Sequence, residues 1–368
     1  MGAHLIRDFA DIGLADRAAA GGKGASLGEL TRAGIPVPPG FVVTTMAFER
    51  ALAAVDPAGS LRGEISRLRP DDHDGIARVA DDVRHRLGTA PVPPAIGAAI
   101  VARYHELSRD PLRDHDGAAS HGVPVAVRSS ATGEDAADAS FAGLQDTYLW
   151  VRGADAVVDH VRKCWASLYN DRAVTYRLHR RHPEDGVAMG VVVQHMVDPR
   201  CAGVMFTRSP ATGDRSVVAV EACWGLGSAL VGGDVTPDSY VVNKVTGEII
   251  KRAVAAKTRR HRRHPSGTGV LMEDVPEELR DEPCLTDDEI RALVRIGRRA
   301  ERHYGTPQDI EWALAGDLPP EAGIVVLQSR PETVWSGRAA APAAAPKRRA
   351  FDHVLDSLSG GADRGAAR

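Results

Sequence analysis

The alternation of hydrophobic and polar residues is clearest between Asp309 and Pro331. Two hydrophobic segments there flank a stretch with glycine, aspartate and two prolines, which is typical of a β-hairpin with a longer loop. Alternate residues of a strand share one face of the sheet. The pattern therefore predicts Asp309 and Glu311 on one face of the first strand, and Ile310 and Trp312 on the other.

The return strand of this hairpin carries a second polar face. The same alternation predicts Gln328 and Arg330 on one side, with Leu327 and Ser329 on the opposite side. If the hydrophobic residues face a core, two carboxylates, an amide and a guanidinium meet on the other side. Carboxylate and amide oxygens are ligands for Mg²⁺, and a guanidinium binds phosphate. A surface hairpin with ordinary charges is the alternative interpretation.

Other segments at strand or helix spacing follow along the chain. Strands are predicted at residues 41–45, 123–127, 148–151, 190–197, 201–208, 217–222, 240–243 and 249–254. Helices are predicted at residues 25–33, 154–177 and 286–304, and residues 46–110 are expected to be helical and surface-exposed. Thr286, followed three residues later by Glu289, has the spacing of a capping box. Trp165, Leu168 and Tyr169 form a stripe that indicates a helix packed on a core.

Length and composition limit the classes of protein to consider. The chain has 368 residues, which allows two or three domains, and 43% of them are hydrophobic and 26% charged. The formal net charge of -3 argues against bulk attraction to nucleic acid or to an anionic membrane. No membrane-spanning run or signal-peptide pattern is visible, so a cytoplasmic location is expected. The four widely spaced cysteines are predicted to be reduced and mostly buried.

A glycine-rich stretch near the N-terminus, Gly21–Gly28, is a candidate phosphate-binding loop. Glycines let backbone N–H groups approach a phosphate, and Lys23 adds a mobile positive charge. The stretch is not a Walker A loop, because Arg17 and Gly24 stand where that pattern needs glycine and a hydroxyl residue. An ordinary tight turn is the alternative interpretation.

Three further segments have candidate chemistry. Arg128, at the end of a predicted strand and followed by small hydroxyl residues, indicates a phosphate-facing loop. The end of strand 190–197 is a candidate hinge that meets an adenine edge. The basic run Lys257–His264 fits either a nucleic acid or phosphorylated partner, or a solvated mobile loop, and the near-neutral net charge favours the loop. The Ser120-His121 pair lies in a polar loop and is not expected to be phosphorylated.

Taken together, these motifs resemble the N-terminal nucleotide-binding domain of phosphoenolpyruvate synthase and pyruvate phosphate dikinase. Rifampin phosphotransferase and the small subunit of phenylphosphate synthase share that domain. The resemblance runs in the family's order from about residue 5 to residue 336, through GGKGASLGEL, GIPVPPGFVVTT, VAVRSSATGEDAADASFAG, ASLYNDRAVTYR, GVMFTRSPATGD, WGLG, TPDSY and IEWAL...VLQSRPETV. It implies an α+β, ATP-grasp fold, with two lobes at residues 1–188 and 189–336 that enclose a nucleotide cleft. Residues 337–368 are predicted to be an Ala/Pro-rich linker and tail.

The resemblance also implies roles for individual residues. It places Lys23 and Arg128 on the nucleotide phosphates, with Arg330 on the phosphates that are transferred, so that Arg128 and Arg330 are the catalytic candidates. The remaining implied residues are Gly143 and Thr147 in the loop that covers the phosphates, Gln194 at the adenine hinge, and Glu311 and Gln328 at the metal. Glu221 and Asp238 are weaker candidates, which either orient other groups or cap a loop.

The function implied is that of the ATP-binding component of a dikinase-type phosphotransferase. Such a protein binds ATP with Mg²⁺ and donates a phosphoryl or pyrophosphoryl group to a histidine on a swivelling domain. No such histidine motif is found in this sequence, so a histidine-domain partner protein is expected, with no nucleic acid and no membrane as partners. A stand-alone remnant of the larger enzyme is the alternative. The final acceptor, whether pyruvate, a phenol or an antibiotic, is not specified by this chain. A non-catalytic ATP-binding regulatory module is the alternative function.

Overall fold

The computed structural model describes residues 4–109, 122–132, 135–136, 139–140, 146–315 and 320–335. Backbone contacts divide the chain into two compact units, Met1–Glu332 and Thr333–Arg368, and every sheet described below belongs to the first. The predicted linker and tail at 337–368 lie outside the described residues, as does the Ser120-His121 pair. Within the described ranges, no helix is both long and hydrophobic enough to cross a membrane.

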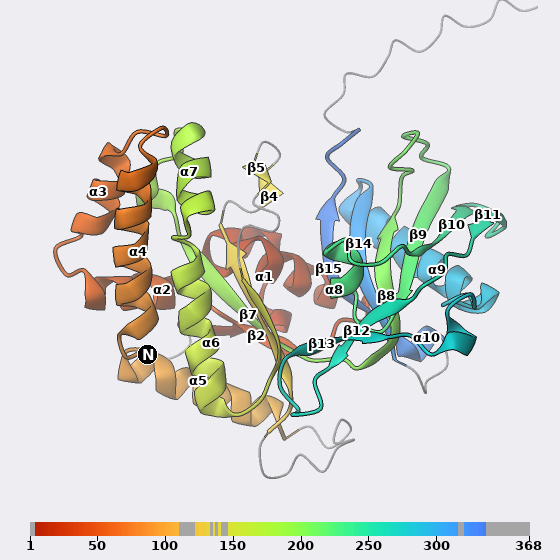
Figure 1. The fold of residues 1–368 in the computed structure, drawn as a ribbon, viewed down its shortest axis with the longest axis horizontal. Helices are drawn as coiled ribbons and strands as arrows, with labels where there is room; N and C mark the ends of the chain where they lie inside the picture. Colours follow the sequence, from red (N-terminus) through yellow and green to blue (C-terminus); the bar gives the residue numbers. More distant parts are fainter. Residues whose placement is uncertain are drawn as a thin grey trace, which may run out of the picture. The chain divides into compact units, whose positions relative to one another are not determined.

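A five-stranded antiparallel sheet is built from the N-terminal half of the chain (Figure 1). Its strands, in spatial order, are β1 (Ile6–Asp8), β2 (Gly40–Val43), β7 (Met189–His195), β3 (Val125–Ala131) and β6 (Thr147–Val151). Strand β3 is longer than predicted and includes Arg128, so this residue belongs to a strand and not to a loop. The reason is that β3 is a central strand, in which every residue is buried and continues the pairing with β7.

Six helices cover one face of this sheet. They are α2 (Thr45–Val55), α3 (Ser60–Arg67), α4 (His73–Thr89), α5 (Pro94–Leu107), α6 (Ala154–Ser167) and α7 (Asp171–His179). The region 46–110 is helical as predicted, but it is not simply surface, because residues such as Phe48 and Ile100 are fully buried in the core. The predicted helix 154–177 is two helices, since the side chain of Asn170 accepts a hydrogen bond from Ala173 N and starts α7. Trp165 is buried as predicted.

Helix α1 (Arg17–Arg32) packs on the opposite face of the five-stranded sheet. The predicted glycine turn is only a one-residue break within α1, at Gly21, whose φ of 70° is left-handed. A Cβ at this position would lie 1.8 Å from the carbonyl oxygen of Ser130, so a glycine is required there. The Ser130 hydroxyl accepts from Gly24 N at 3.0 Å, and Ser26 donates to the Ser329 carbonyl at 2.6 Å. These bonds attach α1 to strands of both large sheets.

A six-stranded antiparallel sheet is built from the C-terminal half. Its order is β11 (Ile249–Ala253), β10 (Asp238–Asn243), β9 (Val217–Trp224), β8 (Pro199–Phe206), β14 (Gln308–Ala315) and β15 (Ile324–Pro331). Strands β14 and β15 confirm the predicted hairpin, and Ile310 and Trp312 are buried on its core side. Helix α9 (Asp287–Tyr304) packs on that side and begins with the predicted capping box of Thr286 and Glu289.

Small elements complete the fold, which is α+β as predicted. They are the hairpin β12 (Arg259–Arg263) and β13 (Val270–Asp274), the pair β4 (Asp135–Ala136) and β5 (Ala139–Ser140), and the short helices α8 (Ser228–Val231) and α10 (Pro320–Gly323). The interpretation of the basic run as a mobile loop is wrong. Most of it is strand β12, and Lys257 has no exposed side-chain surface, because its ammonium group lies 2.6 Å from Asp238 Oδ1. All four cysteines are free and buried, as predicted.

Candidate functional site

A pocket of about 450 Å³ is lined by strands of both large sheets and by α1. Its walls come mainly from β3, β6 and β7 on one side and from β8, β14 and β15 on the other. Of the residues that the sequence singled out, those that line the pocket are Lys23, Arg128, Thr147, Gln194, Glu311, Gln328 and Arg330. Gly143 lies outside the described residues. Side chains that are far apart in the sequence are therefore brought to a single pocket.

Arg128 reaches across this pocket from the five-stranded sheet to the six-stranded sheet. One guanidinium nitrogen, Nη1, donates to the Leu327 carbonyl at 2.8 Å, and the other, Nη2, donates to Gln328 Oε1 at 2.7 Å. Nη2 also lies 3.4 Å from Glu311 Oε2. The side chain is nine-tenths buried, so these contacts are weakly screened by water and hold a positive charge beside a carboxylate.

Glu311 and Gln328 face each other across the hairpin. They are paired in the register of β14 and β15, and Glu311 is also paired with Val204 on β8. The same cross-strand row continues to Glu221 on β9, where burial raises the pKa of the carboxyl. The prediction for Leu327 is wrong, because a bulge shifts the register beside it and this residue lines the pocket.

Asp309 is one of the two carboxylates that the alternation predicted on the polar face of the hairpin, although the family resemblance assigned it no role. It lines the pocket, and its Oδ2 lies 3.4 Å from Arg330 Nε. Burial raises the pKa of this carboxyl to about 6, with Arg330 opposing the shift and Glu332 adding to it. Its Oδ1 is buried without a hydrogen-bond partner in the described part of the chain. A buried carboxylate oxygen without a partner is a candidate ligand for a cation or a donor group.

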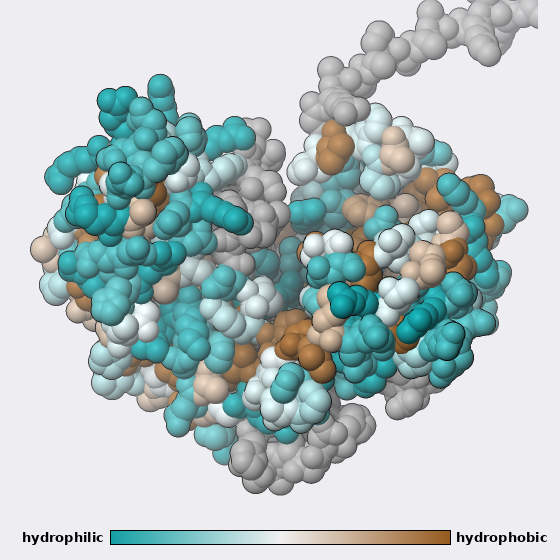
Figure 2. All heavy atoms as spheres, in the orientation of Figure 1, coloured by the Kyte–Doolittle hydropathy of each residue, from teal (hydrophilic) through white to brown (hydrophobic). Residues whose placement is uncertain are grey.

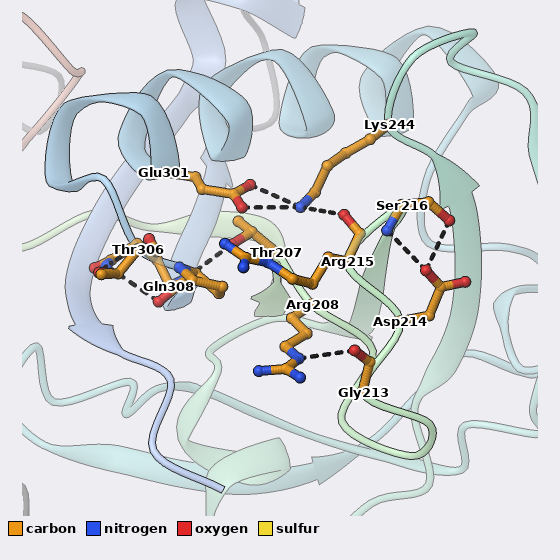
Figure 3. Close-up of polar contacts among 11 residues, drawn as sticks. Thr207, Arg208, Gly213, Asp214, Arg215, Ser216, Lys244, Glu301, Thr306 and Gln308 are labelled. Atoms are coloured by element: carbon orange, nitrogen blue, oxygen red, sulfur yellow. Dashed lines mark hydrogen bonds and ion pairs between the residues drawn. The ribbon is translucent and has the colours of Figure 1, made fainter. Parts of the chain in front are cut away.

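The position of Asp309 is fixed by a polar network at the ends of β8 and β14 (Figure 3). Thr207 and Gln308 are joined twice, by Thr207 N to Gln308 O at 2.9 Å and by Gln308 N to Thr207 Oγ1 at 2.8 Å. Close by, Lys244 bridges Glu301 of α9 and the Arg215 carbonyl, at 2.7 Å and 2.8 Å. The first pair of bonds holds the start of β14 against the end of β8, and the contacts of Lys244 tie α9 to the segment that carries Arg215.

Gln194 connects the pocket to a proline-rich segment between α1 and β2. Its Nε2 donates to the Pro38 carbonyl at 3.3 Å, while its Oε1 lies 3.5 Å from Arg128 Nη1. The next two N–H groups of the predicted hinge are already engaged, because His195 N donates to Pro39 O and Met196 N to Pro124 O. Hydrophobic residues line the pocket as well, among them Leu149, Met196, Val197, Phe206, Leu226 and Val231. Such a wall can accept a planar base.

The polar groups of the pocket fit a hard cation only together with further oxygen ligands. The described residues include no group of three or more His, Cys, Asp or Glu side chains that could hold a metal ion. Asp309 and Glu311 supply carboxylate oxygens and Gln328 an amide oxygen to the same pocket. A Mg²⁺ ion takes one or two carboxylates and completes its octahedron with phosphate and water oxygens. The donor set therefore fits Mg²⁺ that arrives with a polyphosphate.

Asp238, the other weaker candidate, has a structural role instead. Its carboxylate is fully buried away from the pocket, and it accepts hydrogen bonds from Lys257 Nζ, Ala255 N and Cys284 N at 2.6, 3.0 and 2.8 Å. It therefore fastens the segment that leads into β12 to strand β10.

The sequence is similar to proteins of a known family. The family model described as pyruvate phosphate dikinase, AMP/ATP-binding domain, matches residues 17–350. The chain belongs to this family. It is 43% identical, over 88% of its length, to a probable phosphoenolpyruvate synthase of Methanothermobacter thermautotrophicus. It is 44% identical, over 90% of its length, to a rifampicin phosphotransferase of a Streptomyces species.

The relatives are much longer than this chain. The matched region spans 45% of the Methanothermobacter protein and 36% of the Streptomyces protein. A phosphoenolpyruvate synthase of Pyrococcus furiosus, 37% identical over the whole of this chain, is matched over 48% of its own length. The chain thus corresponds to less than half of the length of each of these proteins.

Proposed function

We propose that this pocket binds ATP with Mg²⁺, and that the chain is the ATP-binding component of a phosphoenolpyruvate-synthase-type phosphotransferase. The observation that carries the proposal is the bridge made by Arg128, which joins a strand of one sheet to Glu311 and Gln328 on the other. A guanidinium, two carboxylates and an amide in a single pocket suit a polyphosphate with its metal. Membership of the AMP/ATP-binding family supports ATP as the nucleotide.

The residues of the pocket take distinct roles in this proposal. Lys23, Arg128 and Arg330 hold the phosphates and offset the charge that develops on the transferred group. Glu311 and Gln328, with Asp309, would hold Mg²⁺, which would offset negative charge on the phosphates when bound. Both Thr147, at the start of β6, and Gly143 belong to the segment that covers the phosphates. Gln194 lies at the hinge beside the base.

The fold proposed on this basis is an ATP-grasp. Its two lobes, residues 1–188 and 189–336, enclose the nucleotide between them. The second lobe holds the whole six-stranded sheet, while the five-stranded sheet takes β7 from the second range and its other strands from the first. The boundary falls just before β7, which pairs with β3 in the first sheet. A cleft that closes excludes water from the phosphates and strengthens every electrostatic contact there.

The acceptor in this proposal is a histidine on a separate domain or subunit. An imidazole nitrogen attacks phosphorus, a P–N bond forms as the P–O bond to the departing nucleotide breaks, and the imidazole proton passes to solvent. Phosphoryl transfer needs an in-line nucleophile within about 3–3.5 Å, which a mobile domain can bring to the pocket. The greater length of the relatives is consistent with additional domains beyond the matched part.

Nucleotide binding is tested by calorimetric titration of ATP, with Mg²⁺ and with a chelator in its place. We expect binding that depends on Mg²⁺, because the carboxylates of Asp309 and Glu311 would repel a bare polyphosphate. We expect Glu311→Gln to reduce the Mg²⁺ dependence by removing one ligand charge. Absence of binding with Mg²⁺ present would contradict the proposal.

Transfer is tested with ATP labelled on its β- and γ-phosphates, with and without a candidate histidine-domain protein. We expect no stable phosphoprotein from the chain alone and acid-labile label on the partner's histidine when both are present. Two histidines of this chain are checked for label in the same experiment. His195 lines the pocket, and His121 lies outside the described residues. Acid-labile label on either of them would contradict the requirement for a partner. Binding without transfer to any histidine protein would favour a regulatory module.

A further inference from the structure

A second pocket, of about 580 Å³, lies between strand β6 and the β12–β13 hairpin. It is a different space from the pocket described above, although Thr147, Leu149 and Ser228 border both. Figure 2 shows hydrophobic residues gathered on the visible face where β13 runs past the five-stranded sheet. Of the described residues that line this second pocket, only Thr147 has a role in the proposed transfer reaction.

The walls of the second pocket combine hydrophobic surface with cationic and hydroxyl groups. Hydrophobic surface comes from Leu149, Trp150, Val151, Ala156 and Val270. Polar groups come from Arg152, His160, Ser228, His261 and Thr268. The described residues that line it include neither aspartate nor glutamate. Such a wall attracts an anion and repels no part of a hydrophobic ligand.

Trp150 is the most unusual residue of this pocket. Its φ of 59° is left-handed, a conformation that a bulky side chain rarely adopts, and it lies where the β3–β6 register shifts. Its side chain is 2% exposed, and the Arg263 guanidinium lies 5.2 Å from its ring centroid. The indole Nε1 has no hydrogen-bond partner among the described residues. A strained residue with an unsatisfied buried donor beside a pocket is a candidate for ligand binding.

Two imidazoles add polar ring nitrogens. His160 Nδ1 lies 2.7 Å from the Ala156 carbonyl, so Nδ1 carries a proton and Nε2 is the remaining ring nitrogen. His261 Nδ1 lies 2.9 Å from Ser228 Oγ, and its Nε2 lies 3.9 Å from Asp234 Oδ2. The Tyr148 phenol is already committed, because it donates to Asp146 at 2.7 Å. The indole, the guanidinium of Arg152 and the imidazoles therefore form the polar part of the wall.

We propose that this pocket binds a small organic carboxylate with a flat hydrophobic body. The carboxylate accepts hydrogen bonds from Trp150 Nε1 and Arg152, which is the charge-assisted pairing that favours anions over neutral analogues. The hydrophobic body lies against Leu149, Val151 and Val270. The volume is that of an ordinary small-molecule site.

Benzoate is a suitable probe, and benzamide is its uncharged analogue. Indole N–H signals in a nuclear magnetic resonance spectrum report the site, because the chain has only five tryptophans and Trp150→Phe assigns the relevant signal. We expect benzoate to shift the Trp150 signal and benzamide to bind roughly tenfold or more weakly, since a charge-assisted bond is lost. Trp312 lines the first pocket and Trp165 lines neither, so both signals should stay in place.

Substitutions distinguish benzoate binding in this pocket from a general effect of removing an arginine. Arg152→Gln should weaken benzoate binding roughly tenfold, whereas Arg162→Gln, an arginine of α6 that pairs with Asp159 outside the pocket, should not. Ala156→Phe should place a ring in part of the pocket and weaken benzoate binding with the dispersed spectrum intact. This variant provides the test if Arg152→Gln does not fold.

Three results would overturn the proposal. They are an unmoved Trp150 signal at millimolar benzoate, equal binding of benzamide, and displacement of benzoate by saturating ATP with Mg²⁺. The last would mean that benzoate occupies the first pocket. Failure of ATP to bind at all would count against the proposed function and not against this second site.

Discussion

Replacing Arg128 with methionine is expected to weaken binding of ATP with Mg²⁺ by about 1.5–3 kcal/mol, or roughly ten- to a hundredfold. The guanidinium is the group that spans the pocket, with bonds of 2.7 and 2.8 Å to Gln328 and the Leu327 carbonyl. Its loss would remove the charge-assisted phosphate contact that we propose and would leave Glu311 without the positive charge beside it. Phosphoryl transfer should fall further than binding, because charge on the phosphates grows in the transition state.

Arg200→Met is the matched control for this prediction. Arg200 also donates to a carbonyl and to a carboxylate, Cys284 O at 3.0 Å and Glu289 at 2.6 Å, but it does not line the pocket. The Arg200→Met variant should therefore be less stable than wild type but should bind ATP with unchanged affinity. Arg128→Lys should fall between wild type and Arg128→Met, since lysine keeps the charge and loses the planar fork. Calorimetry compares the ATP affinities of the two variants. If Arg128→Met and Arg200→Met bind ATP equally well, Arg128 serves only to hold the two sheets together.

Local pattern was sufficient to predict the hairpin that carries half of the site. Alternation of residues is a property of each strand alone, so the faces of Asp309, Glu311, Gln328 and Arg330 follow without knowledge of the rest of the fold. The exception is Leu327, which the bulge moved into the pocket wall. A bulge depends on how two strands pair, and the single strand carries no signal for it.

Contacts between distant segments could not be predicted from residue pattern. Arg128 and Glu311 are 183 positions apart, and only the placement of two sheets brings them to 3.4 Å. The resemblance to a family assigned both to one site, which is information about relatives and not about local pattern. Trp150 shows the same limit, because nothing in the sequence of β6 marks a residue with a left-handed backbone.

The basic run shows how burial reverses an interpretation made from charge. A cluster of cationic residues in a chain of near-neutral charge favours a solvated loop, and the exposure of Arg259 agrees with that pattern. Lys257, at the head of the run, is instead fully buried against Asp238. Its partner lies 19 positions earlier on another strand, so the composition of the run gives no indication of the pair.

Lys257→Met is therefore expected to cost about 3–5 kcal/mol of the free energy of unfolding, the usual loss when one partner of a buried ion pair is removed. Methionine has a similar shape, so the cost is chiefly that of a buried carboxylate without its countercharge. The Lys257 ammonium also donates to the Ala255 carbonyl at 2.7 Å, and that acceptor loses its partner as well. Denaturant unfolding, followed by a far-ultraviolet signal, measures the change.

Two further variants decide whether the charge pair is the cause. Arg259→Met removes a charge from the exposed part of the same run and should change stability by no more than about 0.5 kcal/mol. Combining Lys257→Met with Asp238→Asn removes both charges, so the double variant should be more stable than the sum of the two single losses predicts, by about 1–3 kcal/mol. If the two losses of stability are additive, each side chain acts through its own backbone contacts and the ion pair itself contributes little. For Asp238 these contacts are the N–H groups of Ala255 and Cys284.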